Sequence, residues 1–239
     1  MPSIDSANLA TASGVKSLSP QGLNDRLAEA ACYAVLRRLM PVLRHGVAGA
    51  MQPIRIVLVV LERRVQAPEP DLQAIAKNVT TASGLAKQAS IDCISALEWT
   101  GSSNDAHVSV RSGVDEAIKL LAMELSANAL TLDNGISDDL VTAPQSFLRT
   151  VFMGALLAFC DQSAAAGTLQ VTLEAATDPH SAGRLQVRLV PDDSGKSRAA
   201  PEDMICRYRL IEWPDVEAMA RPFGVKVAQG DGWQTLELP

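Results

Sequence analysis

Apolar residues recur every three or four positions through residues 47–96, which is the spacing of helices that bury one stripe. A first run lies at Val47, Met51, Ile54, Leu58, Leu61 and Val65. After the helix-breaking stretch "QAPEP" at 66–70, a second run lies at Leu72, Ile75, Val79, Ala82, Ala86, Ala89, Cys93 and Ala96. The two runs predict an antiparallel helical hairpin within residues 20–100, with these positions as its seam.

The first helix is expected to begin well before this seam. Ser19 is a plausible N-cap and Pro20 suits the first helical position. Pro41 should kink or divide the helix. The second helix is about 45 Å long at 1.5 Å per residue and pairs back to about residue 37, so residues 20–36 overshoot it. Residues 1–19 are rich in Ser and Ala without a pattern, and we expect a loose tail there.

A lone hairpin buries its stripe poorly, because each helix has only one neighbour. Two copies that form a four-helix bundle would bury it well, so we expect a homodimer. An alternative is that the alanine-rich seam packs against the rest of the same chain.

Beyond residue 107 the pattern changes to a mixture of strands and helices. The segments "HVSVRS", "ALTLDN", "TLQVTLEAA" and "RLQVRLVP" are predicted as strands. The segments "GVDEAIKLLAMELSAN", "APQSFLRTVFMGALLAFCDQSAAAG" and "WPDVEAMARPFG" are predicted as helices, the last ending at Gly224. The final "VKVAQGDGWQTLELP" is predicted as a hairpin that turns at Gly-Asp-Gly. With residues 101–107 as a linker, the fold class is α+β, a helical hairpin followed by an α/β domain over residues 108–239.

Composition and charge narrow the choice of partners. The chain has 239 residues, 47% of them hydrophobic, and a net charge of −6, which argues against nucleic acid as a partner. Residues 20–66 nevertheless hold seven arginines against three acids, a local charge of +4. This basic helix favours an acidic partner surface, or it is only a solvated face.

The sequence shows no secretory signal in its first 19 residues and no paired cysteine motif. The first 19 residues lack the basic start and apolar run of a secretory signal, and the apolar run from Ile54 to Leu61 contains Arg55 and is too short for a bilayer. We therefore expect a cytoplasmic protein without a membrane partner. The four cysteines are scattered without a CxxC pair, so reduced thiols are expected rather than disulfides or a metal site.

Three segments, in order, resemble the core of bacterial sensor histidine kinases. "RHGVAGAMQPI" at 44–54 is similar to the histidine box "RHDxxNxLQxI", with matches that include Arg44, His45 and Gln52. "LRTVFMGALLAFCDQS" at 148–163 is similar to the nucleotide-binding helix "LxxvLxNLlxNAxkyS", and "ARPFGVKVAQGDGWQTLELP" is similar to the final hairpin of the domain. The resemblance covers about residues 25–239 and implies an ATPase-like α/β sandwich of the Bergerat type.

The departures from that family remove its ATP chemistry. The two asparagines of the nucleotide helix fall on Gly154 and Ala158, and Ala158 has no oxygen ligand for Mg²⁺. The box that should read D-x-G-x-G is "DDSGKS"; Asp193 there is an adenine-binding residue or simply part of an Asx turn. The segment "CRYRLIEWPDVEAMA" has no glycine to cradle phosphates. We therefore expect no cofactor, no metal and no ATP-dependent autokinase activity.

The histidine box is reduced as well. The acid that usually follows the histidine in these kinases is replaced by Gly46, and the Asn or Thr that serves phosphatase chemistry is replaced by Gly49. A histidine with a pKa near 6.5 is nevertheless a competent nucleophile for phosphate held on an aspartate. His45 is the candidate catalytic residue on this basis.

His45 is expected to face away from the hairpin seam, about 160° round the helix from it. Gln52 and Arg63 share this outer face, and Ile56, Val59 and Val60 also lie outside the seam. Together with Arg44, which would attract an acidic pocket, Gln52, Ile56, Val59 and Arg63 are predicted to dock a partner. Burial of the apolar members in a four-helix bundle explains them equally well.

The leading hypothesis is a dimeric histidine phosphotransferase of a two-component phosphorelay. His45 would pass a phosphoryl group between the aspartates of response-regulator receiver domains, without ATP. The alternative is a non-catalytic pseudo-histidine kinase that sequesters a sensor kinase or a regulator. An active kinase with an unusual nucleotide site and a purely structural helical dimer are further alternatives. His107 at the end of the linker and His180 in a turn are interpreted as solvated histidines. Glu124 and Asp133 are carboxylates with no partner visible in the sequence, and none of these four residues is given a role.

Overall fold

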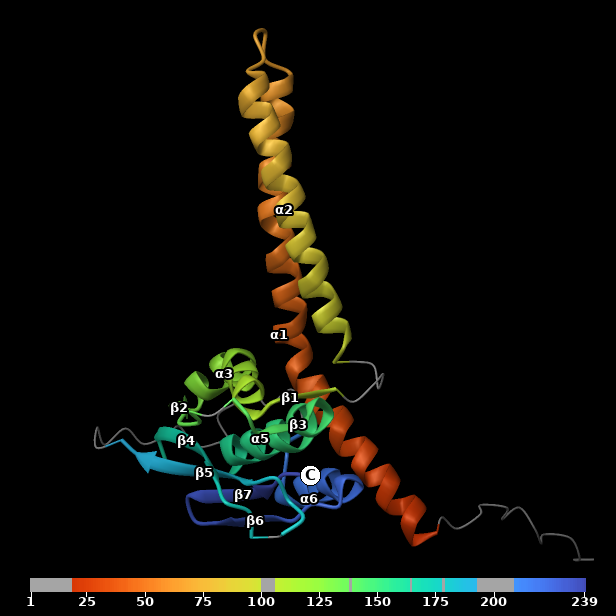
Figure 1. The fold of residues 1–239 in the computed structure, drawn as a ribbon, viewed down its shortest axis with the longest axis vertical. Helices are drawn as coiled ribbons and strands as arrows, with labels where there is room; N and C mark the ends of the chain where they lie inside the picture. Colours follow the sequence, from red (N-terminus) through yellow and green to blue (C-terminus); the bar gives the residue numbers. More distant parts are fainter. Residues whose placement is uncertain (1–18, 100–105, 138, 164, 178, 193–208) are drawn as a thin grey trace, which may run out of the picture.

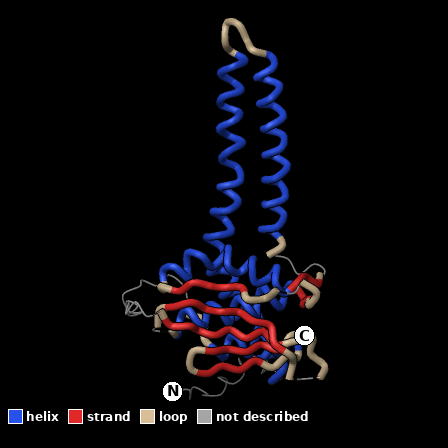
Figure 2. Tube along the Cα trace, turned by 60° about the vertical axis from the view of Figure 1, so that its left-hand side comes forward, coloured by secondary structure: helices blue, strands red, loops and turns tan. Residues whose placement is uncertain are grey.

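The computed structural model describes residues 19–99, 106–137, 139–163, 165–177, 179–192 and 209–239. It consists of a long helical hairpin that stands on an α/β domain (Figures 1 and 2). The α+β fold class predicted from the sequence is confirmed. The predicted tail and most of the predicted linker lie outside the described residues.

The first helix, α1, spans Pro20–Val65 and belongs to both parts of the molecule. Its N-cap is Ser19, whose Oγ accepts a hydrogen bond from the backbone N–H of Gly22, as the sequence predicts. Both Pro41 and Pro53 lie inside the helix. Figure 1 shows that the red first half of α1 runs obliquely and the orange second half upright, so α1 bends but is not divided.

The hairpin is closed by α2, which spans Leu72–Leu97 and begins at the N-cap Asp71. Its seam differs in part from the predicted one. The half-buried positions of α1 along α2 are Val47, Ala50, Ile54, Val57 and Leu61, whereas Met51, Leu58 and Val65 are exposed. On α2, Asn78 and Leu85 are half-buried where Val79 and Ala86 were expected.

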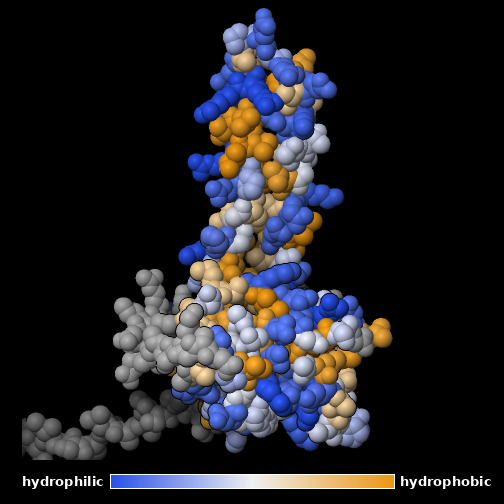
Figure 3. Space-filling model, turned by 90° about the vertical axis from the view of Figure 1, so that its left-hand side faces the viewer, coloured by the Kyte–Doolittle hydropathy of each residue, from blue (hydrophilic) through white to orange (hydrophobic). Residues whose placement is uncertain are grey.

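The physical reason is the width of the apolar surface. α1 carries more apolar positions than one neighbouring helix can cover, so α2 lies along one edge of them and leaves Met51, Leu58 and Val65 uncovered. On the hairpin, Figure 3 accordingly shows apolar patches open to solvent.

The α/β domain is built on a five-stranded sheet of order β2-β4-β5-β7-β6. The strands span Leu130–Asn134 (β2), Gly167–Glu174 (β4), Arg184–Pro191 (β5), Val227–Gly230 (β6) and Trp233–Glu237 (β7). β2 runs parallel to β4 and the other neighbours are antiparallel. A second sheet pairs the short strands β1 (His107–Ser109) and β3 (Thr142–Pro144). The predicted "HVSVRS" strand is thus cut short, because the helix begins at Val110.

Helices cover one face of the main sheet. They are α3 (Val110–Ala127), the continuous α4 (Gln145–Phe147), η1 (Leu148–Phe152) and α5 (Met153–Gln162), and then α6 (Trp213–Ala220) with η3 (Arg221–Phe223). The segment η1 is a π-helix. Gly224 ends the last of these helices in the left-handed conformation, with φ of 67°, as its sequence position predicts.

The first half of α1 completes the core of the α/β domain. Ala31, Val35, Leu39 and Leu43 are buried with residues of α3, α5 and α6 in one cluster. The residues that overshoot the hairpin are therefore not free: α1 lies across the helical layer of the domain (Figure 1). At the start of this contact, the Arg221 guanidinium donates to the Asn24 side-chain oxygen at 2.9 Å.

By length and composition alone, α1 is also long and apolar enough to cross a membrane, with a mean hydropathy of 1.2 over 18 residues. Length and composition alone do not distinguish a membrane-spanning helix from the apolar bundle helix expected from the sequence, so the cytoplasmic location stays a prediction.

Candidate functional site

His45 is exposed on α1 at the level where the hairpin meets the α/β domain. It lies at the edge of a groove of about 500 Å³ between α1 and α3. α1 contributes Arg38, Leu39, Pro41, Val42 and His45 to the lining, α3 contributes Leu120, Leu121, Met123, Glu124 and Ala127, and α5 contributes Leu157. An imidazole in this position is open to a partner on one side and next to a largely apolar wall on the other.

The predicted docking residues lie on the same face of α1 as His45. At 100° per residue, His45, Gln52, Ile56, Val59 and Arg63 fall within about 60° of one another. All five are exposed, and so is Arg44. We call His45, Gln52, Ile56, Val59 and Arg63 the docking strip. Their positions agree with the predicted outer face; their role in docking stays a prediction.

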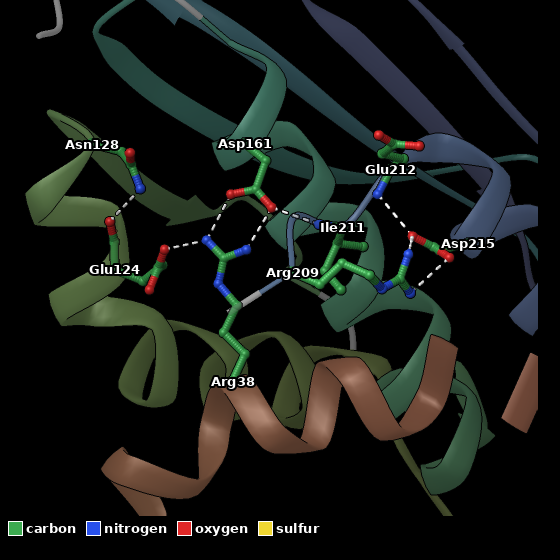
Figure 4. Close-up of polar contacts among 8 residues, drawn as sticks. All are labelled: Arg38, Glu124, Asn128, Asp161, Arg209, Ile211, Glu212 and Asp215. Atoms are coloured by element: carbon green, nitrogen blue, oxygen red, sulfur yellow. Dashed lines mark hydrogen bonds and ion pairs between the residues drawn. The ribbon is translucent and has the colours of Figure 1, made fainter. Parts of the chain in front are cut away.

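A buried ion-pair cluster is centred on Arg38 (Figure 4). Arg38 lies about two helical turns before His45 on α1. Arg38 of α1 donates from Nη1 to Asp161 Oδ2 at 2.5 Å and from Nη2 to Asp161 Oδ1 at 2.7 Å. The same guanidinium donates from Nη2 to Glu124 Oε1 of α3. Asp161 Oδ2 also accepts the backbone N–H of Ile211 at 2.8 Å, just before α6. One arginine thus joins α1 to α3 and α5, and through Asp161 to the start of α6.

The ion pairs of this cluster are shielded from water, which strengthens the attraction between Arg38 and its two carboxylate partners. Arg38 is 7% exposed and Asp161 9%. Burial by itself lowers the pKa of Arg38, but the hydrogen bonds that Arg38 donates to Asp161 and Glu124 outweigh this effect and raise the pKa above its ordinary value. Arg38 therefore stays charged, and its removal would leave Asp161 buried without a counter-ion.

The helix α5, which resembles a nucleotide-binding helix, is buried against α1 and α6. A Cβ at Gly154 would overlap Met219 Cε of α6, and Val35 Cγ2 of α1 would be 3.5 Å away. Ala158 and Met153 are fully buried in the same layer. Where the family has two asparagines, this chain therefore has small residues that let α1 and α6 approach.

Other predicted features lie partly outside the described residues. Residues 193–197 and Cys206 lie outside the described residues, so of the "DDSGKS" segment only Asp192 is described. Within the described residues, no group of three or more His, Cys, Asp or Glu side chains could hold a metal ion. Cys32 and Cys93 are free thiols, and burial raises the pKa of Cys32.

The sequence pattern does not reveal the Arg38 cluster, and it indicates no partner for Glu124. The partners are 86 and 123 residues away from Arg38, so spacing does not reveal them. A signal was nevertheless present: Arg38 falls between Val35 and Leu39 on the stripe that continues as Ala31 and Leu43. A charge inside such a stripe indicates a buried partner.

Comparison with known proteins leaves the family open. No family model and no curated protein matches the sequence. Solved structures with a related fold include the Acinetobacter baumannii histidine kinase AdeS, with 14% identity, 78% of this chain and 96% of that chain covered, and a TM-score of 0.40. A histidine kinase from Burkholderia phymatum has 14% identity, coverage of 92% and 97%, and a TM-score of 0.37.

A third is the histidine kinase ThkA in complex with the response regulator protein TrrA, with 10% identity, coverage of 94% of this chain and 68% of that chain, and a TM-score of 0.37. All three likenesses have TM-scores under 0.5, and none of them establishes a function for this chain.

Proposed function

We propose that this protein is a histidine phosphotransferase of a two-component phosphorelay, which moves a phosphoryl group between receiver aspartates through His45 without binding ATP. The observation that carries the proposal is the exposed His45, on a rigid helix within the segment that resembles a histidine box. The docking strip continues from it along the same face of α1.

The proposed transfer requires only an accessible imidazole nitrogen from this chain. A neutral imidazole nitrogen of His45 attacks the phosphorus of an aspartyl phosphate on the donor receiver. The P–N bond forms as the P–O bond to the aspartate breaks, and the carboxylate leaves. The imidazolium proton passes to solvent. Transfer to a second receiver is the reverse of these steps, so no oxidant, nucleotide or acid next to the histidine is required.

Absence of ATP chemistry is part of the proposal and has its own support. Gly154 and Ala158 lack the side-chain oxygens that the family uses, and apolar side chains of α1 and α6 cover Gly154.

The homodimer is also proposed rather than observed. Met51, Leu58 and Val65 form a second apolar stripe on α1, with exposed fractions of about half, and Leu72 and Val79 of α2 are exposed too. Burying this surface against a second hairpin would give a four-helix bundle and leave His45 accessible on the opposite side.

The decisive experiment compares wild type with His45→Ala. The purified protein is incubated with phosphorylated receiver domains and, separately, with labelled ATP and Mg²⁺. We expect acid-labile label from at least one receiver, none from ATP, and none in His45→Ala. His107→Ala is the matched control and should be labelled like wild type. Label from ATP, or equal label in His45→Ala, would contradict the proposal.

A second function is favoured by Gly46, which stands where an acid usually follows the histidine. In this alternative the protein is a pseudo-histidine kinase that binds and sequesters a sensor kinase or a regulator. It predicts tight receiver or kinase binding that His45→Ala leaves intact, with no label from any donor.

A further inference from the structure

The groove beside His45 has an apolar wall that the proposed phosphotransfer does not use. Leu120 and Met123 of α3 face Pro41 and Val42 of α1 across it. Met123 is 75% exposed, although methionine side chains gain most from contact with other apolar atoms. Exposed methionine at the edge of a groove is typical of surfaces that adapt to a partner.

Geometry identifies the occupant of this groove. A receiver that transfers its phosphoryl group must bring the phosphorus within bonding distance of an imidazole nitrogen of His45. Because His45 is itself part of the groove lining, a domain-sized partner bound there also covers the neighbouring α3 residues. The groove and the docking strip are continuous, since Arg38, His45 and Gln52 repeat at seven-residue intervals along one face of α1.

The α3 wall is tied to α1 by the ion-pair cluster. Arg38 holds Glu124 of α3, one residue after Met123, and holds Asp161 of α5 through two hydrogen bonds. Glu124 is 28% exposed in its side chain, so the tie to α3 lies at the bottom of the groove rather than deep in the core. Loss of this tie frees α3 to shift relative to His45.

We propose that the groove between α1 and α3 is a second part of the receiver-docking surface, and that Arg38, acting through Glu124, is the positioning residue that holds its α3 wall beside His45. This inference rests on the proposed phosphotransfer at His45. It adds Leu120 and Met123 to the docking strip and gives the buried arginine a role in recognition.

The test uses two donors that differ in size. Phosphoramidate is a small donor that needs no docking surface, whereas a phosphorylated receiver domain does; the receiver is the one that labels wild type best. Met123→Glu changes the α3 side of the groove, and Glu124→Gln weakens the contact between Arg38 and α3. Glu124→Gln leaves Arg38 paired with Asp161, so the protein should still fold. Arg111→Gln is the control, because Arg111 lies on the same helix but its guanidinium is at the exposed surface, where it pairs with Asp139 at 3.8 Å and donates to the Ser137 carbonyl oxygen at 3.5 Å.

We expect both variants to raise KM for the phosphorylated receiver by about tenfold, the loss typical of an interface position that matters. We expect kcat and labelling by phosphoramidate to stay at wild-type values, and Arg111→Gln to behave like wild type. This split between KM and kcat separates a docking role from general damage to the fold. Arg38→Lys should fall between wild type and Glu124→Gln, since it keeps the charge but not the two-pronged contact.

Two results would overturn the inference in different ways. If Met123→Glu and Glu124→Gln transfer from the receiver with the KM of Arg111→Gln, the groove is not part of the docking surface, and phosphotransfer at His45 stands. If no donor labels His45 in wild type, the proposed phosphotransfer fails and the inference with it.

Discussion

At the scale of single residues, Gly154 determines what can lie against the α5 helix. A Cβ there would overlap Met219 Cε and lie in ordinary contact with Val35, and both of these residues are buried. The glycine is therefore needed for packing rather than for backbone freedom. A side chain at this position therefore requires Met219 of α6 to move.

Replacing Gly154 should accordingly destabilise the protein in proportion to the group introduced. We expect Gly154→Ala to lower the free energy of unfolding by about 1–2 kcal/mol, because the flexible end of Met219 can move. Gly154→Asn should cost about 2–4 kcal/mol, because it also buries an amide among apolar side chains. Urea denaturation measures both.

Gly84 offers a matched control, since its position on α2 has open space around it. Gly84→Ala should be neutral or stabilising by about 0.5–1 kcal/mol. Equal stability of Gly154→Asn and wild type would show that α1 does not pack against α5 as observed. ATP binding by the wild-type protein would contradict the proposed loss of the nucleotide site.

At the scale of elements, α1 presents two apolar surfaces on different sides of the hairpin. The stripe of Met51, Leu58 and Val65 lies about 130° from the docking strip. We assign the stripe to the second copy and the strip to the receiver, because a four-helix bundle covers one side of each hairpin and leaves the other open. The sequence pattern alone does not distinguish apolar residues that contact a second copy from apolar residues that dock a receiver.

Charge substitutions on the two surfaces should therefore have separate effects. Met51→Glu with Leu58→Glu should convert the homodimer to a monomer, because two carboxylates would be buried in the bundle. Ile56→Glu with Val59→Glu should leave the dimer intact and weaken receiver binding by tenfold or more, about 1.4 kcal/mol. Analytical ultracentrifugation and receiver titration measure the two properties. If the second pair also abolishes the dimer, the docking strip is buried in the bundle instead.

At the scale of the whole molecule, one helix belongs to two structural units. The first half of α1 is part of the core of the α/β domain, and the second half is part of the hairpin. The Arg38 cluster lies where these halves meet, below His45. The direction in which the hairpin leaves the domain is therefore set by buried contacts rather than by a linker.

Hydrogen exchange should reveal this division along α1. We expect amides of residues 28–43 to exchange as slowly as those of β4 and β5, because they open only with the domain. Amides of residues 55–65 should exchange about a hundredfold faster at low protein concentration, and slow down as concentration drives dimerisation. Rapid exchange over 28–43 would show that α1 leaves the domain independently.

Local patterns in the sequence already determine most of the elements. Helical spacing predicts α1 and α2, alternation predicts β4 and β5, and Ser19 and Gly224 mark two helix ends, because these features depend on neighbours within a few residues. The exposure of His45 follows from the same spacing, since the face opposite a buried stripe is solvated.

Only the tertiary structure decides which apolar positions pair and which charges meet. α1 has more apolar residues than α2 can cover, so the seam is chosen by where α2 lies, and Met51, Leu58 and Val65 stay exposed. Arg38, Glu124 and Asp161 come together from three helices far apart in the chain. Their pairing, and the groove it supports beside His45, depend on how α1 crosses the domain, which no local pattern records.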